Sequence, residues 1–332
     1  MYYFLTYSFL VILVSIFFKK KKLLLNYTGD RHQSFSNQKN IPLIGGIFLI
    51  LPLILMNYQN IVYSILLILI FLLGFLSDQK ILISAKKRFL LQIILVFFSV
   101  IFLDLEILTS KLILFDYFLK NHVFNIFFTA FCLLILINGS NFIDGLNGLL
   151  LSYMTFVIFI LLKLGLLNEL SIKYDFINYL ILFTIIIILL NLCNYLMLGD
   201  AGAYILSFFV GYLIIKCHIS NPNISPYFFI TLLWYPCYEN LFSIIRKLKS
   251  KLSPLIPDNN HLHQLIYIRF KKKIIRSQLI ANNISSLIIS LVNFIIILIS
   301  SLNPYSSFYQ IKLIIFSMFL YSFIFIIIKK RP

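Results

Sequence analysis

Apolar segments long enough to cross a bilayer alternate along this chain with short polar or basic segments. A transmembrane helix needs about 20 mostly apolar residues. Eleven segments approach that length, so the pattern predicts an all-α, polytopic integral membrane protein with about eleven transmembrane helices, or ten if one segment does not span. The predicted spans are 2–18, 41–57, 61–76, 89–104, 122–139, 146–167, 176–197, 201–219, 226–244, 278–300 and 308–328. We expect residues 1–332 to form a single membrane-embedded domain.

The composition agrees with this prediction. Hydrophobic residues make up 61% of the 332 positions and charged residues 12%, which is too apolar for an ordinary globular protein. The first apolar run precedes its basic cluster at 19–22, the reverse of the order in a signal peptide, so we interpret it as a retained span. The four cysteines lie inside apolar runs without metal-binding spacing, which disfavours disulfides and a zinc site.

Basic residues are concentrated in the predicted loops. Of the 28 Lys and Arg residues, 22 fall in 19–40, 77–88, 245–277 and 329–331. Because positive residues favour the cytoplasmic side, we expect the N-terminus outside and the C-terminus inside. The net charge of +17 then reflects membrane orientation and does not indicate nucleic-acid binding. We predict that 245–277 is a cytoplasmic basic loop, with an amphipathic segment after His263 that lies against anionic lipid.

The same count of spans places several polar loops on the cytoplasmic side together. These loops carry Asp78, Asp144, Asp200, Asp258, His261 and His263. The opposite side has only short connections apart from 105–121, whose apolar alternation predicts an interfacial segment. A soluble substrate could therefore meet four carboxylates and two histidines on one face of the membrane.

A polar island at 138–148 separates the fifth and sixth predicted spans. Asn, Asp and Gly are common turn residues, so the island alone is compatible with a tight cytoplasmic turn. Asn138, Asn141 and Asp144, however, recur at intervals of three, which would place them on one side of a helix end. Carboxylate and amide side chains are costly in hydrocarbon, so the island also indicates a binding or catalytic site.

The other polar segments each have a structural and a functional interpretation. Asp200 could cap a helix, or it could bind Mg²⁺ together with nucleotide phosphates. Asp78 could be neutralised by the basic residues that follow it, which include Arg88 and three lysines, or it could belong to a phosphate and metal site in which base and cation lie together. Two histidines at i and i+2 could be satisfied surface residues or could donate to a pyrophosphate. Glu239 could pair with Arg246 or Lys247, or it could take part in the site.

Six segments match one set of motifs in order. They are 39–46 (Lys-x-x-Pro-x-x-Gly-Gly), 74–78 (Gly-Phe-x-Asp-Asp, with Ser77 for the first Asp), 88–92 (Arg-x-x-x-Gln), 141–148 (Asn-x-x-Asp-Gly-x-Asp-Gly, with Asn147 for the second Asp), 198–202 (x-Gly-Asp-x-Gly) and 257–263 (Pro-Asp-x-x-His-x-His). Together they resemble the polyprenyl-phosphate N-acetylhexosamine-1-phosphate transferases, the family that includes phospho-N-acetylmuramoyl-pentapeptide transferase. The His-x-His loop favours the sugar-nucleotide branch of that family.

The resemblance implies a reaction and a location. The chain would transfer N-acetylhexosamine-1-phosphate from a UDP-sugar to undecaprenyl phosphate, giving undecaprenyl-diphospho-sugar and UMP. This would be the initiating step of a cell-envelope glycan, such as lipopolysaccharide O-antigen or a cell-wall polymer, at the cytoplasmic face of a bacterial inner membrane. The sugar, the pathway and a homodimeric state stay open. Two alternatives also stay open: a transporter or flippase for polyprenyl lipids, and an inactive relative that carries Ser77, Asn147 and Gln264 in place of the motif residues.

The resemblance also implies residue roles. The catalytic residues would be Asp78, Asp144 and Asp200, with Asp200 and Asp144 binding Mg²⁺, or Mn²⁺ in its place. The substrate-binding residues would be Lys39, Asn141, Asn147, His261 and His263. Ser77, in place of the first aspartate of the pair, disfavours a mechanism in which that aspartate acts as nucleophile or base. A phosphate monoester is nevertheless largely dianionic at neutral pH, since its second pKa is about 6, so the lipid phosphate could attack directly.

Overall fold

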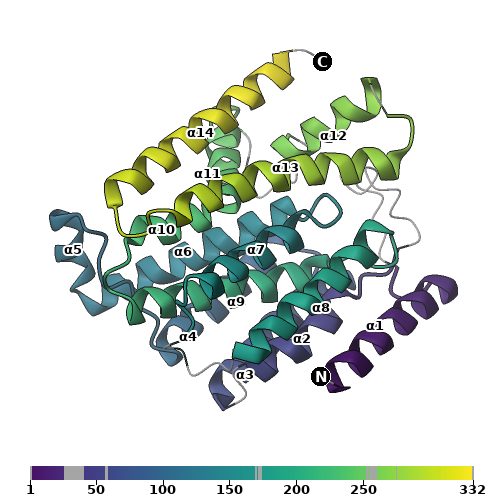
Figure 1. Ribbon diagram of the computed structural model, residues 1–332, viewed down its shortest axis with the longest axis horizontal. Helices are drawn as coiled ribbons and strands as arrows, with labels where there is room; N and C mark the ends of the chain where they lie inside the picture. The colour runs from purple at the N-terminus through teal and green to yellow at the C-terminus, as the bar shows by residue number, and fades with distance from the viewer. Residues whose placement is uncertain are drawn as a thin grey trace.

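The computed structural model describes residues 2–25, 41–56, 59–168, 170, 174–251, 253, 260–273 and 275–330. Fourteen helices lie within these residues (Figure 1). They are α1 (Tyr2–Lys21), α2 (Gly45–Met56), α3 (Ile61–Asp78), α4 (Ala85–Phe102), α5 (Ile113–Leu119), α6 (His122–Ile143), α7 (Leu149–Lys163), α8 (Tyr174–Leu192), α9 (Gly199–Ser220), α10 (Pro226–Leu232), α11 (Trp234–Lys249), α12 (Leu262–Lys273), α13 (Gln278–Ser301) and α14 (Ser307–Lys330). Lys39 and Asp258 lie outside the described residues.

The predicted all-α class is confirmed, and each predicted span coincides with a helix or a helix pair. By length and composition, six helices could cross a membrane within the described residues, or seven if α10 and α11 form one broken span with a bend of 76°. Helices α2 and α7 are apolar but shorter. The protein is therefore a multi-pass membrane protein, whereas the count of eleven spans and the orientation of the termini stay predictions.

Polar side chains begin several of the helices. Asn60, Ser84, Asn121 and Ser277 each precede a helix, and each side-chain oxygen accepts a hydrogen bond from the backbone N–H three residues later. The first N–H groups of a helix have no partner inside the helix, so these caps satisfy donors that would otherwise be costly to bury. The caps explain why these long apolar runs start as helices where they do.

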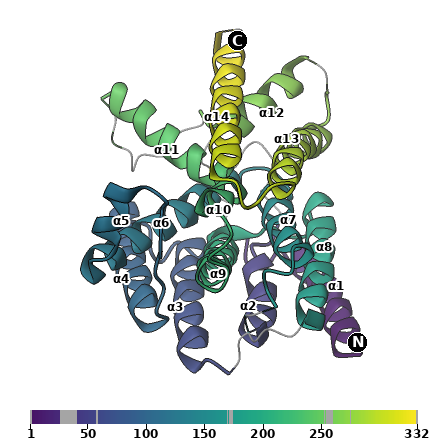
Figure 2. The same ribbon diagram turned by 60° about the vertical axis from the view of Figure 1, so that its left-hand side comes forward.

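Helix α9 lies in the middle of the molecule, with α2, α3, α6 and α7 around it (Figure 2). Small residues allow this close packing. A Cβ atom added at Gly46 of α2 would lie 2.5 Å from the backbone N of Gly202, and one added at Gly74 of α3 would overlap the backbone of Ala201. Glycine removes this obstacle, so the backbones of α2 and α3 meet the first turn of α9.

The segment before α2 is paired with the segment before α9. Leu43 and Met197 form an isolated parallel bridge, in which the Met197 N–H donates to the Pro42 carbonyl at 2.8 Å and the Gly45 N–H donates to the Met197 carbonyl at 2.9 Å. These bonds fix the backbone at Met197, three residues before Asp200. The Pro-x-x-Gly part of the first motif thus holds in place the segment that precedes α9.

Two predicted surface segments are also helical. In the predicted interfacial segment 105–121, α5 exposes apolar side chains, with Ile113 94% and Leu114 77% exposed. The predicted basic loop 245–277 contains the end of α11 and all of α12. The first residues of α12, including His263, are buried, so this helix packs on the protein at its start, and its contact with lipid stays a prediction.

Candidate active site

Asp78, the last residue of α3, caps the N-terminus of α9. Its Oδ1 accepts a hydrogen bond from the N–H of Asp200 at 2.8 Å, and its Oδ2 accepts one from the N–H of Ala201 at 3.0 Å. Gly199 precedes this cap with φ +74°, and a Cβ there would lie 2.6 Å from Asp78 Oδ2, so the turn requires glycine. The sequence left open whether the Asp200 side chain caps α9. In the structure the capping side chain is that of Asp78.

Ser77 and Arg88 hold the side chain of Asp200. The Ser77 hydroxyl donates to Asp200 Oδ2 at 2.6 Å and accepts a hydrogen bond from Arg88 Nη1 at 2.6 Å. Arg88 Nη1 also lies 3.0 Å from Asp200 Oδ2, in an ion pair that is partly open to solvent. Neither Ser77 nor Arg88 was among the predicted site residues, although Arg88 was one of the cations expected near Asp78. The signal that pointed to Arg88 was the Arg-x-x-x-Gln motif, which begins ten residues after Asp78.

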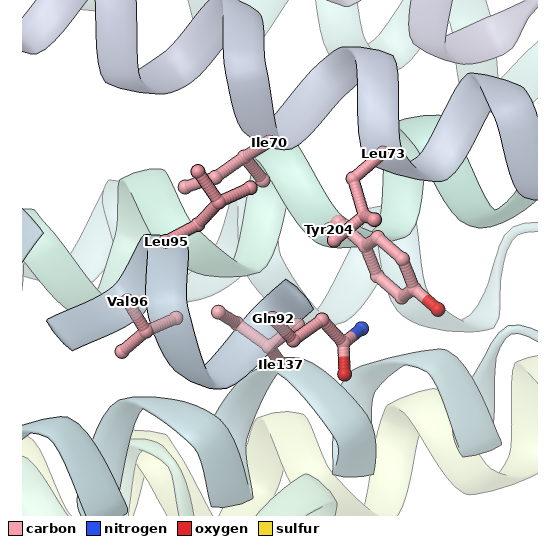
Figure 3. A pocket seen from close by; sticks show the side chains of 7 residues that line it. All are labelled: Ile70, Leu73, Gln92, Leu95, Val96, Ile137 and Tyr204. Atoms are coloured by element: carbon pink, nitrogen blue, oxygen red, sulfur yellow. The ribbon is translucent and has the colours of Figure 1, made fainter. Parts of the chain in front are cut away.

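A small cavity lies one helical turn from the Arg88–Asp200 pair. Gln92 follows Arg88 by four residues on α4, and Tyr204 follows Asp200 by four on α9, so each pair shares a helix face. Gln92 and Tyr204 line this cavity of about 10 Å³, and the remaining lining is apolar: Ile70, Leu73, Leu95, Val96 and Ile137 (Figure 3). Such a volume holds about one water molecule at most. The polar site around Arg88 and Asp200 therefore ends one helical turn away, at this apolar packing between α3, α4, α6 and α9.

Asp144 follows directly after α6 and adds a third carboxylate. Burial raises its pKa well above the usual range, and the negative charges of Asp200 and Asp78 raise the pKa further. Neither Asp144 nor Asn141, which is half-buried on the last turn of α6, makes a side-chain hydrogen bond within the part of the chain that the structure describes. The ends of three helices thus bring Asp78, Asp144 and Asp200 into one electrostatic environment.

His263 packs against the island. Its side chain is fully buried, and neither ring nitrogen has a hydrogen-bond partner among the described residues. A Cβ at Gly145 would lie 2.7 Å from His263 Nε2, so the absence of a side chain at Gly145 lets the imidazole approach. Burial lowers the pKa of His263 to about 3, although the Glu239 carboxylate opposes this shift. At neutral pH the ring is therefore neutral, with one N–H donor and one acceptor nitrogen.

His261 is held on two sides. Its ring centroid lies 4.9 Å from that of Phe142 in α6, and its Nδ1 lies 2.8 Å from Oε1 of Glu239. The second Glu239 oxygen accepts a hydrogen bond from the hydroxyl of Tyr321 in α14. Arg246 and Lys247 were the predicted pairing partners of Glu239, whereas in the structure His261 and Tyr321 bind its two carboxylate oxygens. Tyr321 lies in an apolar helix without a motif, so no sequence signal pointed to it.

Asn147 connects the island to two other segments. Its backbone N–H donates to Asn282 Oδ1 at 2.8 Å, and its side-chain Nδ2 donates to Asn194 Oδ1 at 2.8 Å and to Asn283 Oδ1 at 3.1 Å. The residue is 2% exposed. These contacts give Asn147 a structural task, which sequence reasoning missed; the role in substrate binding that the resemblance implies stays a prediction.

Comparison with known proteins identifies the family. Residues 33–218, more than half of the chain, match the sequence profile of glycosyl transferase family 4. The chain belongs to this family. A similar protein, the undecaprenyl-phosphate alpha-N-acetylglucosaminyl 1-phosphate transferase of Thermotoga maritima, is 27% identical over 268 residues, which cover 80% of this chain and 79% of that protein.

Membership of glycosyl transferase family 4 rests on the part of the chain that contains the three carboxylates. Asp78, Asp144 and Asp200 all lie within the matched residues, as does Arg88. The Glu239–His261 pair and all of α10–α14 lie beyond residue 218. The candidate active site therefore combines carboxylates from the family region with a histidine segment supplied by the C-terminal part of the chain.

Proposed function

We propose that this protein transfers N-acetylhexosamine-1-phosphate from a UDP-sugar to undecaprenyl phosphate, giving undecaprenyl-diphospho-sugar and UMP. The observation that carries the proposal is the convergence of Asp78, Asp144 and Asp200 beside the buried His263, in a member of glycosyl transferase family 4. The name of the Thermotoga maritima relative supports both the lipid acceptor and the transferred sugar phosphate. We further propose that the site faces the cytoplasm at a bacterial inner membrane.

The reaction needs two anionic phosphates to approach each other. A phosphate oxygen of the acceptor attacks the sugar-linked phosphorus, and the bond from that phosphorus to the bridging oxygen breaks, so that UMP leaves. Phosphoryl transfer depends mainly on positioning and on neutralising this charge. Arg88, a cation that is partly open to solvent beside Asp200, is suited to attract the phosphates, and Asp78 fixes the backbone of Asp200 in place.

No general base is required in this scheme. The acceptor phosphate is largely dianionic at neutral pH, because its second pKa is about 6. Ser77, at the position of the first aspartate of the motif, is a neutral group that links Arg88 to Asp200 by hydrogen bonds. Its place in this chain is compatible with positioning and does not suit proton abstraction. Direct attack by the acceptor is therefore the route that these residues support.

We also propose Mg²⁺ as the cofactor, with Mn²⁺ as a substitute. Within the described ranges no group of three or more His, Cys, Asp or Glu side chains forms a complete metal site. Magnesium sites that bear nucleotide phosphates, however, often use one or two carboxylates and take their other oxygens from phosphate and water. Asp200 and Asp144 fit this donor set. Burial raises the pKa of Asp144, the charges of Asp200 and Asp78 raise it further, and a bound cation would offset both effects. When bound, the ion would neutralise charge on the diphosphate.

The substrate-binding residues follow from the same geometry. His263 offers a neutral N–H beside the island, and its lack of a hydrogen-bond partner among the described residues favours a contact with substrate oxygen. His261 lies next to it, with the two ring centroids 5.7 Å apart. Asn141, on the last turn of α6, is placed to contact the nucleotide or the ion. The role of Lys39 in attracting the lipid phosphate is a proposal from the motif alone.

The experiment that tests the proposal measures UMP and lipid product together. Purified protein in lipid nanodiscs is incubated with undecaprenyl phosphate, Mg²⁺ and a panel of UDP-sugars. We expect one UDP-sugar to give equal amounts of UMP and lipid-linked sugar, and we expect excess EDTA to abolish both. Absence of Mg²⁺-dependent UMP with every sugar in the panel would contradict the proposal and favour a transporter or an inactive relative.

A further inference from the structure

A buried carboxylate joins the C-terminal helix to the histidine segment. Glu239 of α11 is 1% exposed. Its Oε1 lies 2.8 Å from Nδ1 of His261, and its Oε2 accepts a hydrogen bond of 2.7 Å from the Tyr321 hydroxyl. A buried carboxylate is costly unless both of its oxygens have partners. Glu239, His261 and Tyr321 therefore form a unit in which each member depends on the others.

Helix α14, which carries Tyr321, also packs against α12, whose first residue, Leu262, directly follows His261. The helix that binds the acid facing His261 therefore also contacts the helix that begins next to His261. Tyr321 itself is 2% exposed and packs in T-shaped geometry on Tyr238 of α11. The position of α14 consequently controls both the direction of the His261 ring and the start of α12.

The contact with Glu239 also controls which nitrogen of His261 carries a proton. An imidazole whose Nδ1 faces a carboxylate holds a proton on Nδ1, and such partners commonly fix the tautomer and orientation of functional histidines. The other side of the ring contacts Phe142, two residues before Asp144. The ring is held between α11 and the end of α6, beside the island.

We infer that Glu239 and Tyr321 are positioning residues for sugar-nucleotide binding, which act by holding His261 in the Nδ1-protonated form and in a fixed orientation. The inference rests on the proposed function, because that proposal assigns the sugar nucleotide to His261. It extends the functional unit to α14, a helix beyond the family region at 33–218. The outermost C-terminal helix is thus part of the substrate-binding apparatus.

The chain offers a matched control for this inference. The Tyr238 hydroxyl lies 2.8 Å from Ser322 Oγ, so Tyr238 joins the same two helices, α11 and α14, without a hydrogen bond to the Glu239 carboxylate among the described residues. Tyr321→Phe and Tyr238→Phe each remove one hydroxyl group from the same interface. A role limited to bracing the two helices predicts similar effects of the two substitutions, whereas a positioning role predicts an effect of Tyr321→Phe alone on sugar-nucleotide binding.

The kinetic test compares the two variants with the wild type. We expect Tyr321→Phe to raise KM for the UDP-sugar about threefold to tenfold, with KM for undecaprenyl phosphate unchanged, because one hydrogen bond that orients His261 is lost. Tyr238→Phe should change KM for the UDP-sugar less than about twofold, which is below the usual effect of a lost hydrogen bond, because the bond that it removes holds Ser322 and not Glu239. Equal KM values for the UDP-sugar in the two variants would overturn the inference.

A second test does not depend on turnover. Histidine ring ¹⁵N chemical shifts are measured for the full chain in detergent, and the His261 signals are assigned by their loss in His261→Asn. We expect an Nδ1-protonated ring in the wild type and in Tyr238→Phe, with a shifted tautomer population in Glu239→Gln. An Nε2-protonated His261 in the wild type would overturn the inference. If the wild type turns over no UDP-sugar, the proposed function fails, and this measurement still decides how His261 is held.

Discussion

The surroundings of Asp144 and of Asn147, two side chains of similar size in the polar island at 138–148, are different. Asp144 has no side-chain hydrogen bond among the described residues, and its pKa is raised by burial and by two other acids. Asn147 donates hydrogen bonds from its backbone and from its side chain to three asparagine oxygens, while its own Oδ1 has no partner among the described residues. The surroundings of Asp144 are electrostatically unfavourable, whereas the N–H groups of Asn147 are all held by neighbouring segments.

This difference separates a reactive role from a structural one. A buried polar group that has partners stabilises the fold, whereas a buried charge without partners costs free energy that the rest of the fold must offset. Asp144 is therefore the residue for which a ligand would relieve an unfavourable state. Asn147, next to the α7 N-terminus, mainly holds the island against α13. The motif alone did not distinguish them.

Asp144→Asn should have the strongest effect on activity of the substitutions at these two residues. We expect kcat/KM to fall at least about 100-fold, or about 2.7 kcal/mol, since the change removes a charge from the site. We also expect thermal stability to be kept or increased, because the raised pKa of Asp144 means that its charge destabilises the folded state at neutral pH. Steady-state kinetics and thermal unfolding in detergent measure the two effects. Full activity in this variant would contradict the assignment.

Asn147→Ala should show the opposite pattern. Loss of the amide leaves the side-chain oxygens of Asn194 and Asn283 without this donor, which costs about 1–3 kcal/mol. We expect a lower unfolding temperature, with kcat/KM of the folded protein within about threefold of the wild type, since the residue lies outside the proposed chemistry. Unchanged stability with a large rise in KM for the UDP-sugar would instead establish Asn147 as a substrate-binding residue.

The pH dependence of stability tests the crowding around Asp144 directly. A carboxyl group whose pKa is raised in the folded state binds its proton more tightly there than in the unfolded state. The stability that this tighter binding adds to the folded state is fully present below the ordinary pKa of 3.8. It is lost as pH rises through the raised pKa. In EDTA, the unfolding temperature of Asp144→Asn minus that of the wild type should therefore increase with pH. A difference that stays constant with pH would show that Asp144 is not crowded.

The smallest effect is expected for Ser77→Ala. The Arg88–Asp200 ion pair remains in direct contact at 3.0 Å, so only the hydroxyl bridge is lost. We expect kcat/KM to fall about twofold to tenfold, which is the usual effect of one hydrogen bond. Ser64→Ala removes a hydroxyl group from the same helix, where among the described residues it bonds only to the Asn60 carbonyl, and should have no effect on kcat/KM. A loss as large as that of Asp144→Asn would indicate a reactive role for Ser77.

The helices and the three carboxylates could be predicted from the sequence. Every predicted span coincides with a helix or a helix pair, because burial in lipid or protein requires apolar side chains over a whole helix. The acids Asp78, Asp144 and Asp200 interrupt the apolar runs at helix ends, and the structure brings them into one electrostatic environment, while the count of spans that predicted this grouping stays a prediction. The 76° bend between α10 and α11 could not be predicted, since an apolar pattern indicates which residues are buried and does not indicate the direction of the helix axis.

The partners of the polar residues also could not be predicted. Asn282 and Asn283 lie in an apolar helix more than 130 residues after Asn147, and nothing local marks them as its partners. Tyr321 is one of 20 tyrosines, and its contact with Glu239 depends on how α14 packs on α11. Sequence patterns specify which groups must be satisfied, whereas tertiary packing decides which groups satisfy them.

If the carboxylate cluster carries out sugar-phosphate transfer, Asp200→Asn should abolish it. UMP release is measured at saturating Mg²⁺, undecaprenyl phosphate and UDP-sugar, with Asp104→Asn as the matched control, because Asp104 is an exposed acid just after α4, at the end opposite Arg88. We expect Asp200→Asn to lose at least about 99% of the UMP release, a tenfold loss for each 1.36 kcal/mol, and Asp104→Asn to retain it. Wild-type UMP release by Asp200→Asn would show that the cluster does not carry out the transfer.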